Sequence, residues 1–220
     1  MVIDFHIHSK YSFDCFLEPS KIVAKARLCG LEGLAVTDHD TMAGVEEFRR
    51  LAPDLYIIAG QEVSTRDGDI MGLFLSEEIK LMTETKDVIA EIRRQGGLAV
   101  LAHPFKWPHL RRDPKFLRQF DAVESFNARN NIPVPYLENF LGARAQQKYG
   151  LRAVAGSDTH EGFELGRART IFSFNKADAC DAKIKEAILR GQVVLEGREV
   201  SLAKEIVSHF SRQARSFLKR

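Results

Sequence analysis

The stretch Met1-Val2-Ile3-Asp4-Phe5-His6-Ile7-His8-Ser9 opens the chain and predicts a β-strand that ends in two histidines. Residues i and i+2 of a strand lie on the same face of a sheet, so His6 and His8 are expected to reach one metal ion together. Two histidines near the start of a chain are more often ordinary polar surface. Their meaning therefore depends on the residues at the ends of the other strands.

Donors of the same kind recur where later apolar runs end. They are Asp38, His39, Asp40, Glu62, His103, Asp158 and His160, each at the start of an expected loop. Imidazole and carboxylate together suit Zn, Mn or Fe, and clustered ions of this kind activate water for hydrolysis. A carboxylate at the end of an apolar strand, such as Glu62 or Asp158, carries a desolvation cost that a bound cation would offset. We therefore expect a metal centre.

Composition limits the class of protein. The chain has 220 residues, 45% hydrophobic and 28% charged, with a formal net charge of +2. These values are typical of one soluble domain, and the total charge gives no argument for nucleic-acid binding. Cys15, Cys29 and Cys180 are odd in number and form no C-x-x-C pair, which predicts reduced thiols. Without a leader sequence or a membrane-spanning run, the protein is expected to be cytoplasmic and to have no membrane partner.

Eight apolar runs and six amphipathic segments are the expected strands and helices. The strands lie at residues 2–8, 34–37, 55–63, 70–75, 98–102, 122–126, 152–155 and 168–174. The helices lie at residues 19–29, 41–51, 83–95, 114–119, 135–149 and 177–190. This alternation predicts a mostly parallel α/β sheet closed into a barrel, with the active site at the carboxyl ends of the strands. The short connection at residues 65–69 predicts a hairpin, and hence an irregular barrel.

Five motifs succeed one another along residues 1 to about 170. They are His6-Ile7-His8-Ser9 with Tyr11-Ser12, Thr37-Asp38-His39, Gly60-Gln61-Glu62, Ala102-His103-Pro104, and Gly156-Ser157-Asp158-Thr159-His160. In this order they resemble the motifs of the PHP (polymerase and histidinol phosphatase) superfamily. The resemblance implies a single-domain distorted (β/α)7 barrel, two or three divalent metal ions, and hydrolysis of a phosphoester. It does not identify the substrate.

The resemblance also implies metal-binding roles, residue by residue. His6, His8 and Asp158 would hold one ion, and Glu62 would bridge that ion to a second one at His103. A bridging carboxylate of this kind places Glu62 among the expected catalytic residues.

A third ion site, or its remnant, would be completed by Asp14, His39 and His160. Asp69 departs from the pattern, because relatives often have histidine there, although a carboxylate still binds metal. His39 and His160 are also candidates to protonate the leaving group, since imidazole titrates near neutrality. A metal-bound imidazole cannot do both.

Two further acids have alternative roles. Glu124 is either a metal ligand or a surface charge at a strand end, and Asp4 either supports a histidine ring or is exposed to solvent.

Substrate recognition is expected in the loop after His103. Its cations are Lys106, Arg111, Arg112, Lys115 and Arg118, and its rings are Trp107, His109 and Phe116. Such a mixture pairs with phosphates and stacks on a base, although a solvated loop leading into a basic helix would look the same. Arg129, Arg167 and Arg169 are further candidates to clamp a phosphate, or else structural arginines on the barrel rim.

Residues 1–197 are expected to form the barrel, and residues 198–220 a C-terminal amphipathic helix packed on it. A nucleic-acid or membrane-surface role for that helix is the alternative.

Three functions compete. The leading hypothesis is a metal-dependent phosphatase acting on a small phosphorylated substrate, either a nucleotide or a metabolite phosphate. The second is a phosphodiesterase or nuclease acting on oligonucleotides or on RNA or DNA ends, favoured by the basic aromatic loop. The third is a non-catalytic scaffold, against which the retained histidines and acids argue.

Overall fold

A computed structural model describes residues 1–106, 113–129, 137–201, 203, 204, 206–208 and 210. Nine strands lie in these ranges: β1 Val2–Ile7, β2 Gly33–Val36, β3 Tyr56–Thr65, β4 Gly68–Leu73, β5 Leu98–Leu101, β6 Ala122–Asn127, β7 Ala153–Gly156, β8 Ala168–Phe172 and β9 Val193–Gly197. The helices are α1 Pro19–Leu28, α2 Val45–Leu51, α3 Thr85–Arg94, α4 Pro114–Leu117, α5 Leu137–Tyr149, the 3-10 helix η1 Lys176–Asp178, and α6 Asp181–Arg190.

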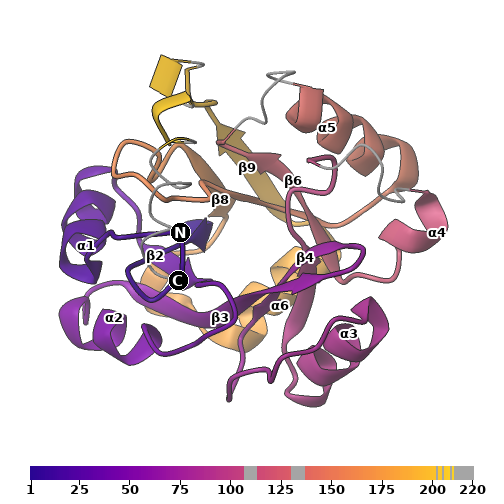
Figure 1. Cartoon of the computed structure of the whole chain (residues 1–220), viewed down its shortest axis with the longest axis horizontal. Helices are drawn as coiled ribbons and strands as arrows, with labels where there is room; N and C mark the ends of the chain where they lie inside the picture. Colours follow the sequence, from indigo (N-terminus) through magenta and orange to yellow (C-terminus); the bar gives the residue numbers. More distant parts are fainter. Residues whose placement is uncertain (107–112, 130–136, 202, 205, 209, 211–220) are drawn as a thin grey trace.

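All nine strands belong to one sheet with the order β7-β6-β5-β4-β3-β2-β1-β8-β9. Strands β1, β2 and β3 pair in parallel, as do β5, β6 and β7. Between these two groups β4 runs antiparallel to both of its neighbours, which is the expected hairpin. The sheet curls into a nearly closed barrel surrounded by helices (Figure 1). The expected α/β fold, a distorted barrel in a single domain, is confirmed.

Backbone hydrogen bonds close the barrel between β1 and the segment after β7. The amide of His8 donates to the carbonyl of Thr159 at 3.1 Å, and the amide of Asp158 donates to the carbonyl of His6 at 2.8 Å. Ile7 and Thr159 form a parallel bridge at the same place. Closure therefore occurs at the carboxyl ends of the strands, among the predicted metal donors.

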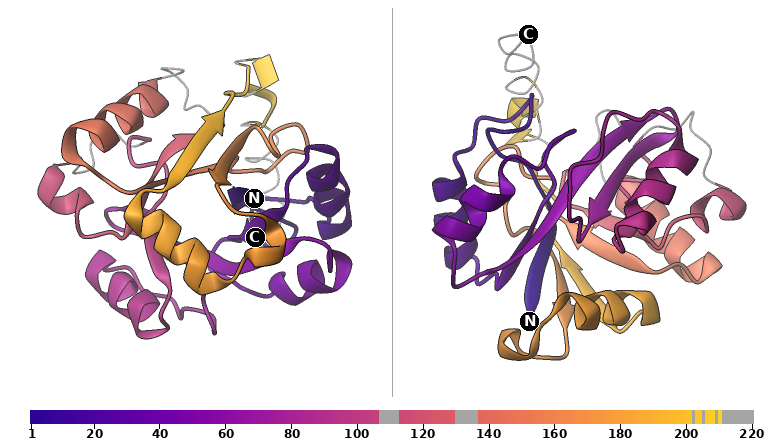
Figure 2. Two further views of the ribbon diagram at one scale, coloured as in Figure 1. Left: turned by 180° about the vertical axis from the view of Figure 1, so that it is seen from behind. Right: turned by 90° about the horizontal axis from the view of Figure 1, so that it is seen from below.

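Helix α6 lies across the opposite end of the barrel, beside the N-terminus (Figure 2). Its buried residues Ile184, Ala187 and Ile188 belong to one apolar cluster with Ile3 of β1 and Val100 of β5. This packing seals the amino ends of the strands and leaves the carboxyl ends for the polar residues. No helix among the described residues has the length and apolar character that crossing a membrane requires.

Strand β9 has no counterpart among the eight predicted strands. It is short and half-exposed, since Val194, Glu196 and Gly197 face solvent, so its apolar signal is weak. Its pairing with β8 comes from tertiary contact, with Leu195 opposite Thr170 and Val193 opposite Phe172. The edge strand is therefore defined by its neighbour more than by its own sequence.

The described part of the C-terminal segment contacts the barrel at the buried residues Val200, whose amide donates to the carbonyl of Ala128 at 2.8 Å, and Ser208. Residues 203, 204, 206–208 and 210 are helical, and the hydroxyl of Ser208 donates to Glu164 Oε1 at 2.6 Å. The rest of the predicted terminal helix, including residues 211–220, lies outside the described residues.

Gly156, the last residue of β7, lets β1 and β7 approach. A Cβ atom there would lie 2.3 Å from His6 Cβ and 2.8 Å from the His6 amide nitrogen, both far inside van der Waals contact. It would also lie 2.7 Å from Glu124 Oε1. Only a residue without a side chain allows the closure.

We predict that Gly156→Ala lowers the free energy of unfolding by about 1–3 kcal/mol or more, because the added methyl group overpacks the seam between β1 and β7. Chemical denaturation followed by circular dichroism measures the change. Gly162→Ala is the matched control, since a Cβ atom at Gly162 meets nothing within 4 Å. Equal stability of the two variants would contradict the role given to Gly156.

Candidate metal centre

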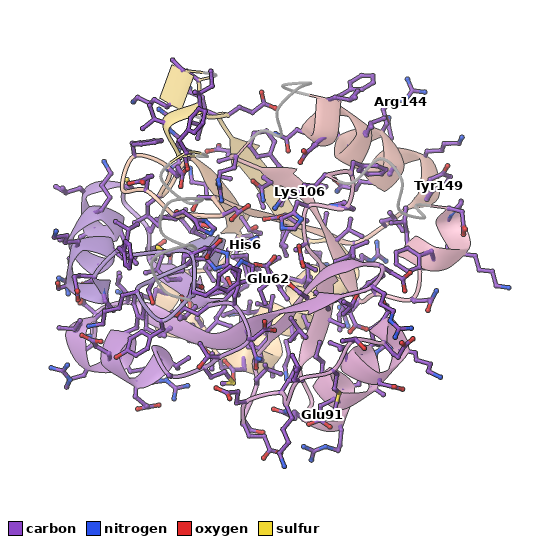
Figure 3. The ribbon with its side chains drawn as sticks, in the orientation of Figure 1. His6, Glu62, Glu91, Lys106, Arg144 and Tyr149 are labelled. Carbon is purple, nitrogen blue, oxygen red and sulfur yellow. The ribbon has the colours of Figure 1, made fainter. Side chains whose placement is uncertain are left out.

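Five strands bring the predicted donors together at the centre of the barrel, where Figure 3 labels His6 and Glu62. The donors are His6 and His8 at the end of β1, Asp14 in the next loop, His39 after β2, Glu62 in β3, His103 after β5, and Asp158 and His160 after β7. All are buried except His39, whose side chain is 11% exposed. Residues distant in the sequence thus form one recessed cluster.

The carboxylate of Glu62 lies at the middle of the cluster. Its Oε2 is 3.3 Å from His6 Nε2, 3.2 Å from His8 Nε2 and 3.2 Å from His39 Nδ1. Its Oε1 is 3.1 Å from His103 Nε2. The backbone aligns these groups, because the amide of Asp40 donates to the Glu62 carbonyl at 2.9 Å.

The donor atoms fit a metal site better than a hydrogen-bond network. Glu62 Oε2 is buried and has no hydrogen-bond partner among the described residues, although three imidazole nitrogens surround it. Two ligands of one ion, each about 2.1 Å from it, lie roughly 3.4 Å apart at a tetrahedral angle. The observed separations are close to that value. Shared cations would satisfy these atoms.

Three overlapping groups of donors have all their atoms within 4.8 Å of one another. They are His8, Asp14, His39 and His160; His6, His8 and Asp158; and His6, Glu62 and His103. Compared with the sites that the family resemblance implies, His8 also joins the group of Asp14, and His6 also joins the group of His103. In the first group Asp14 Oδ2 lies 2.9 Å from His160 Nε2 and 3.7 Å from His39 Nε2.

Asp69 lies at the edge of the third group and is not part of it. Its Oδ2 is 3.7 Å from His103 Nε2, and its side chain is 17% exposed. Its role as a ligand of the second ion stays a prediction.

Carboxylates control the charge of the imidazoles. Burial alone would lower the pKa of His6, but Glu62, Glu124 and Asp158 outweigh it and hold that pKa well above the usual value. Burial lowers the pKa of His8, and the neighbouring His160 and His39 lower it further. The pKa values of the two adjacent imidazoles are therefore shifted in opposite directions.

Groups behind the donors fix the orientation of the rings. Glu124 Oε1 accepts a hydrogen bond from His6 Nδ1 at 3.0 Å, and the hydroxyl oxygen of Ser12 accepts one from His8 Nδ1 at 3.0 Å. Each contact leaves the Nε2 lone pair directed into the cluster, as a metal-binding histidine requires. Glu124 is thus fully buried behind a ligand, which differs from both of the roles expected for it.

Asp4 is also buried, and it supports the backbone instead of a histidine ring. Its carboxylate accepts from the amides of Ser157 at 2.8 Å, Gly166 at 3.2 Å and His6 at 3.3 Å. Burial raises the pKa of Asp4 to about 6. The alternatives of ring support and solvent exposure are both wrong, because the closing barrel surrounds Asp4 with amides.

Backbone strain gathers at the same place. His103, Asp158 and Asp40 have positive φ angles of 26°, 52° and 52°. Such conformations are costly for residues with a Cβ atom and persist mainly at functional sites. The side chains of His103 and Asp158 both belong to the donor groups.

Arg129 is the one predicted phosphate-clamping arginine that the described structure brings to the donors. It is buried, and its Nη1 lies 3.2 Å from Asp158 Oδ1 and 2.7 Å from His160 Nδ1. Lys106 lies in the loop after His103, and its amide donates to the carbonyl of His103 at 3.1 Å. Arg111 and Arg112 lie outside the described residues.

Arg167 and Arg169 do not reach the donors. Arg167 donates to the carbonyls of Phe163 at 2.9 Å and Glu199 at 3.1 Å, and Arg169 Nε lies 3.3 Å from Glu196. Both line a separate cavity on the flank of the barrel. Burial alternates along β8, and Arg169 lies on its outer face between the buried residues Ala168 and Thr170.

Phe116 cannot stack on a base. It is 5% exposed and packs against Phe120, with ring centroids 5.3 Å apart. Phe116 lies on the apolar face of the short helix α4, and this face packs into the core. Trp107 and His109 lie outside the described residues.

Two residues near the donors had no role in the sequence-based expectations. Glu138, in the first turn of α5, has a buried Oε1 without a hydrogen-bond partner among the described residues, and burial raises its pKa to about 7. Phe13 is 51% exposed and its ring centroid lies 5.0 Å from that of His39. The position of Phe13 beside Asp14 was the only sequence signal for either.

Comparison with known proteins agrees with the geometry. The model of the PHP domain family matches residues 4–190. Two uncharacterised proteins of Methanocaldococcus jannaschii are similar in sequence. One is 37% identical over 58% of this chain and 82% of its own length, and the other is 30% identical over 79% and 71%. A 5'-3' exoribonuclease of Haemophilus influenzae is 42% identical over 64 residues, which is 28% of this chain and 23% of that protein.

Solved structures share the fold at 18% identity. PsfC of Pseudomonas syringae superposes with a TM-score of 0.67 over 99% of this chain and 98% of its own. A candidate metal-dependent phosphoesterase of Bifidobacterium adolescentis superposes with a TM-score of 0.61 over 92% of this chain and 98% of its own. An amidohydrolase of Chromobacterium violaceum, with bound sulfate and no metal, superposes with a TM-score of 0.63 over 87% of this chain and 97% of its own. With a family match over most of its length and a buried cluster of metal donors, the chain belongs to the PHP domain family and is a metal-dependent hydrolase.

Proposed function

We propose that the protein hydrolyses a small phosphomonoester, a nucleotide or a metabolite phosphate, using two or three divalent ions held by the donor cluster. Phosphoester hydrolysis is the chemistry that the PHP domain and the donor set support in general. The finer choice rests on one observation: the donors are recessed, with at most 5% of the side chain exposed at His6, Glu62 and Asp158. A terminal phosphate enters such a recess from one side, whereas an internal diester must bring chain on both sides.

Bound divalent ions would neutralise phosphate oxygens and supply a water of lowered pKa. Among the chain's own groups, Glu62 holds donors of two groups at fixed separation, and Glu124 and Ser12 keep the imidazole rings in place. Arg129 adds a fixed guanidinium beside Asp158, where it would pair with a phosphate oxygen.

Proton transfer to the leaving group stays assigned to His39 or His160, as the sequence predicts. His160 is the less available of the two, because its Nε2 faces Asp14 at 2.9 Å and its Nδ1 faces Arg129 at 2.7 Å. The one partly exposed donor is His39, so it is the better placed to meet a leaving group.

A nuclease is the second candidate. The match to the exoribonuclease of Haemophilus influenzae favours it, but that match covers 64 residues. Imidazole and carboxylate donors suit Mn, Zn and Fe alike, so the metal belongs to the proposal. Cys15, Cys29 and Cys180, which form no disulfide with one another, fit a reducing compartment such as the cytoplasm.

We predict that the purified protein carries Mn, Fe or Zn. Chelation should abolish hydrolysis and lower the melting temperature, because removing the ions leaves buried carboxylates uncompensated. Elemental analysis and thermal denaturation, before and after chelation and again after metal is returned, test this. A metal-free protein that takes up none of these ions on reconstitution would rule the centre out.

Glu62→Gln should lower hydrolysis by orders of magnitude while the fold survives, since the amide keeps the shape and removes the negative charge at the middle of the cluster. Turnover and bound metal are measured on the same sample. Glu46→Gln is the control, because the Glu46 side chain is 80% exposed. Wild-type turnover and full metal content in Glu62→Gln would show that the central assignment is wrong.

Neutralising Lys106, Arg111 and Arg112 separates the two candidate functions. If these residues bind the phosphate of a small substrate, KM for monoesters should rise with little dependence on substrate length. If these residues contact a polynucleotide backbone, the substitutions should weaken the binding of long substrates more than that of short ones. Binding by the variant should also depend less on salt than binding by the wild type.

We expect the first outcome, with exposed Lys86→Gln on α3 as the control. Cleavage of oligonucleotides by the wild type, without phosphate release from nucleotides or sugar phosphates, would favour the nuclease instead.

A further inference from the structure

A second cavity lies on the flank of the barrel, between α1 and the β8–β9 hairpin, with a volume of about 760 Å³. Its charged lining consists of Lys25, Arg167, Arg169, Arg198 and Glu196. No donor of the metal cluster is among the described residues that line it. The cavity is therefore a separate feature of the fold, and the proposed hydrolysis does not use it.

Its charge is unusual for this chain. The whole sequence has 32 basic and 30 acidic residues, yet four cations here face one carboxylate. These cations come from separate elements, since Lys25 is on α1, Arg169 on β8 and Arg198 directly after β9. Like charges that the fold brings together repel one another, and an anion between them would relieve that repulsion.

The arginines are held in place with donors to spare. Arg167 uses Nε and Nη1 on the carbonyls of Phe163 and Glu199, which fixes the plane of its guanidinium. Arg169 uses Nε on Glu196 at 3.3 Å. A guanidinium has five N–H donors, so each retains N–H groups for a ligand. A pre-oriented guanidinium pairs with phosphate oxygens with little loss of side-chain entropy.

The backbone also shapes the cavity. Gly166 has a φ of +73°, and a Cβ atom there would lie 2.8 Å from Cys29 Cβ. The loop can therefore approach α1 closely only with glycine at this position. The resulting volume is within the range of small-molecule sites, about 300–1,000 Å³, which favours a compact ligand over a polymer.

We propose that this cavity binds a small phosphate-bearing anion, held by Arg167, Arg169, Arg198 and Lys25. The site would take either free inorganic phosphate or the phosphate group of a small organic molecule. It lies apart from the metal centre, so the protein would bind two such anions at once.

Calorimetric titration of the metal-loaded protein tests the proposal. Two probes are used: inorganic phosphate, and phenylphosphonate, which the protein cannot hydrolyse as a phosphoester. The wild type should bind two equivalents, one at the metal centre and one in the cavity. Arg169→Gln/Arg198→Gln should lose one equivalent or weaken it roughly tenfold or more, as expected for charge-assisted hydrogen bonds. The probe that binds the cavity more tightly identifies the source of the phosphate.

The control is Arg144→Gln/Lys148→Gln, which removes two cations from α5 on the outer edge of the barrel (Figure 3). It should keep both equivalents. Arg198→Gln alone, at an exposed position, is tested in case the double variant misfolds. Its melting temperature should match that of the wild type.

Two equivalents of unchanged affinity in Arg169→Gln/Arg198→Gln would overturn the proposal, and so would a wild type that binds no equivalent which these substitutions remove or weaken. So would an equal loss in the α5 control, which would indicate general charge attraction. If the cavity substitutions weaken the binding of a single-stranded oligonucleotide much more than the binding of either probe, the cavity binds a nucleic-acid strand and the small-anion assignment is wrong.

Discussion

Closure of the barrel between β1 and the segment after β7 is the constraint on which the site depends. The hydrogen bonds that close it, His8 to Thr159 and Asp158 to His6, join the backbones of the donors themselves. A shift of one residue in this register would turn His6 and His8 to the other face. Fold and site are therefore specified by the same contacts, and neither can change alone.

The electrostatics of the centre result from that constraint. Closure buries Asp14, Glu62, Glu124 and Asp158 near one another, and each carboxylate is costly in a region that excludes water. The imidazoles compensate in part, and Arg129 holds the pKa of Asp158 low against the effect of burial. Glu62 Oε2 still lacks a hydrogen-bond partner among the described residues. The cluster is thus built around charge that the protein itself does not supply.

Local patterns were enough to predict most of the strands, the helices and the direct donors. The clearest predicted helix has an apolar face, as α3 shows, where Val88, Ile89 and Ile92 are buried. The donors come after strands whose carboxyl ends must meet in a parallel barrel. What failed depends on tertiary packing. The position of Glu124 behind His6 arises only when β6 and β1 converge, and Phe116 entered the core because of its neighbours.

The positions of the arginines, like that of Glu124, could not be predicted from local sequence. Arg129 and Arg169 are indistinguishable as sequence signals, since both adjoin an apolar run near a donor motif. Their different positions result from the faces they occupy: Arg129 follows the carboxyl end of β6 and is buried, whereas Arg169 lies on the outer face of β8, where burial alternates along the strand. The loop between β7 and β8 connects the two environments, because His160 lies near one end and Arg167 at the other. Glu164 within it accepts from the amide of His160 and from Ser208, so the metal centre, the flank cavity and the C-terminal segment share one short stretch of backbone.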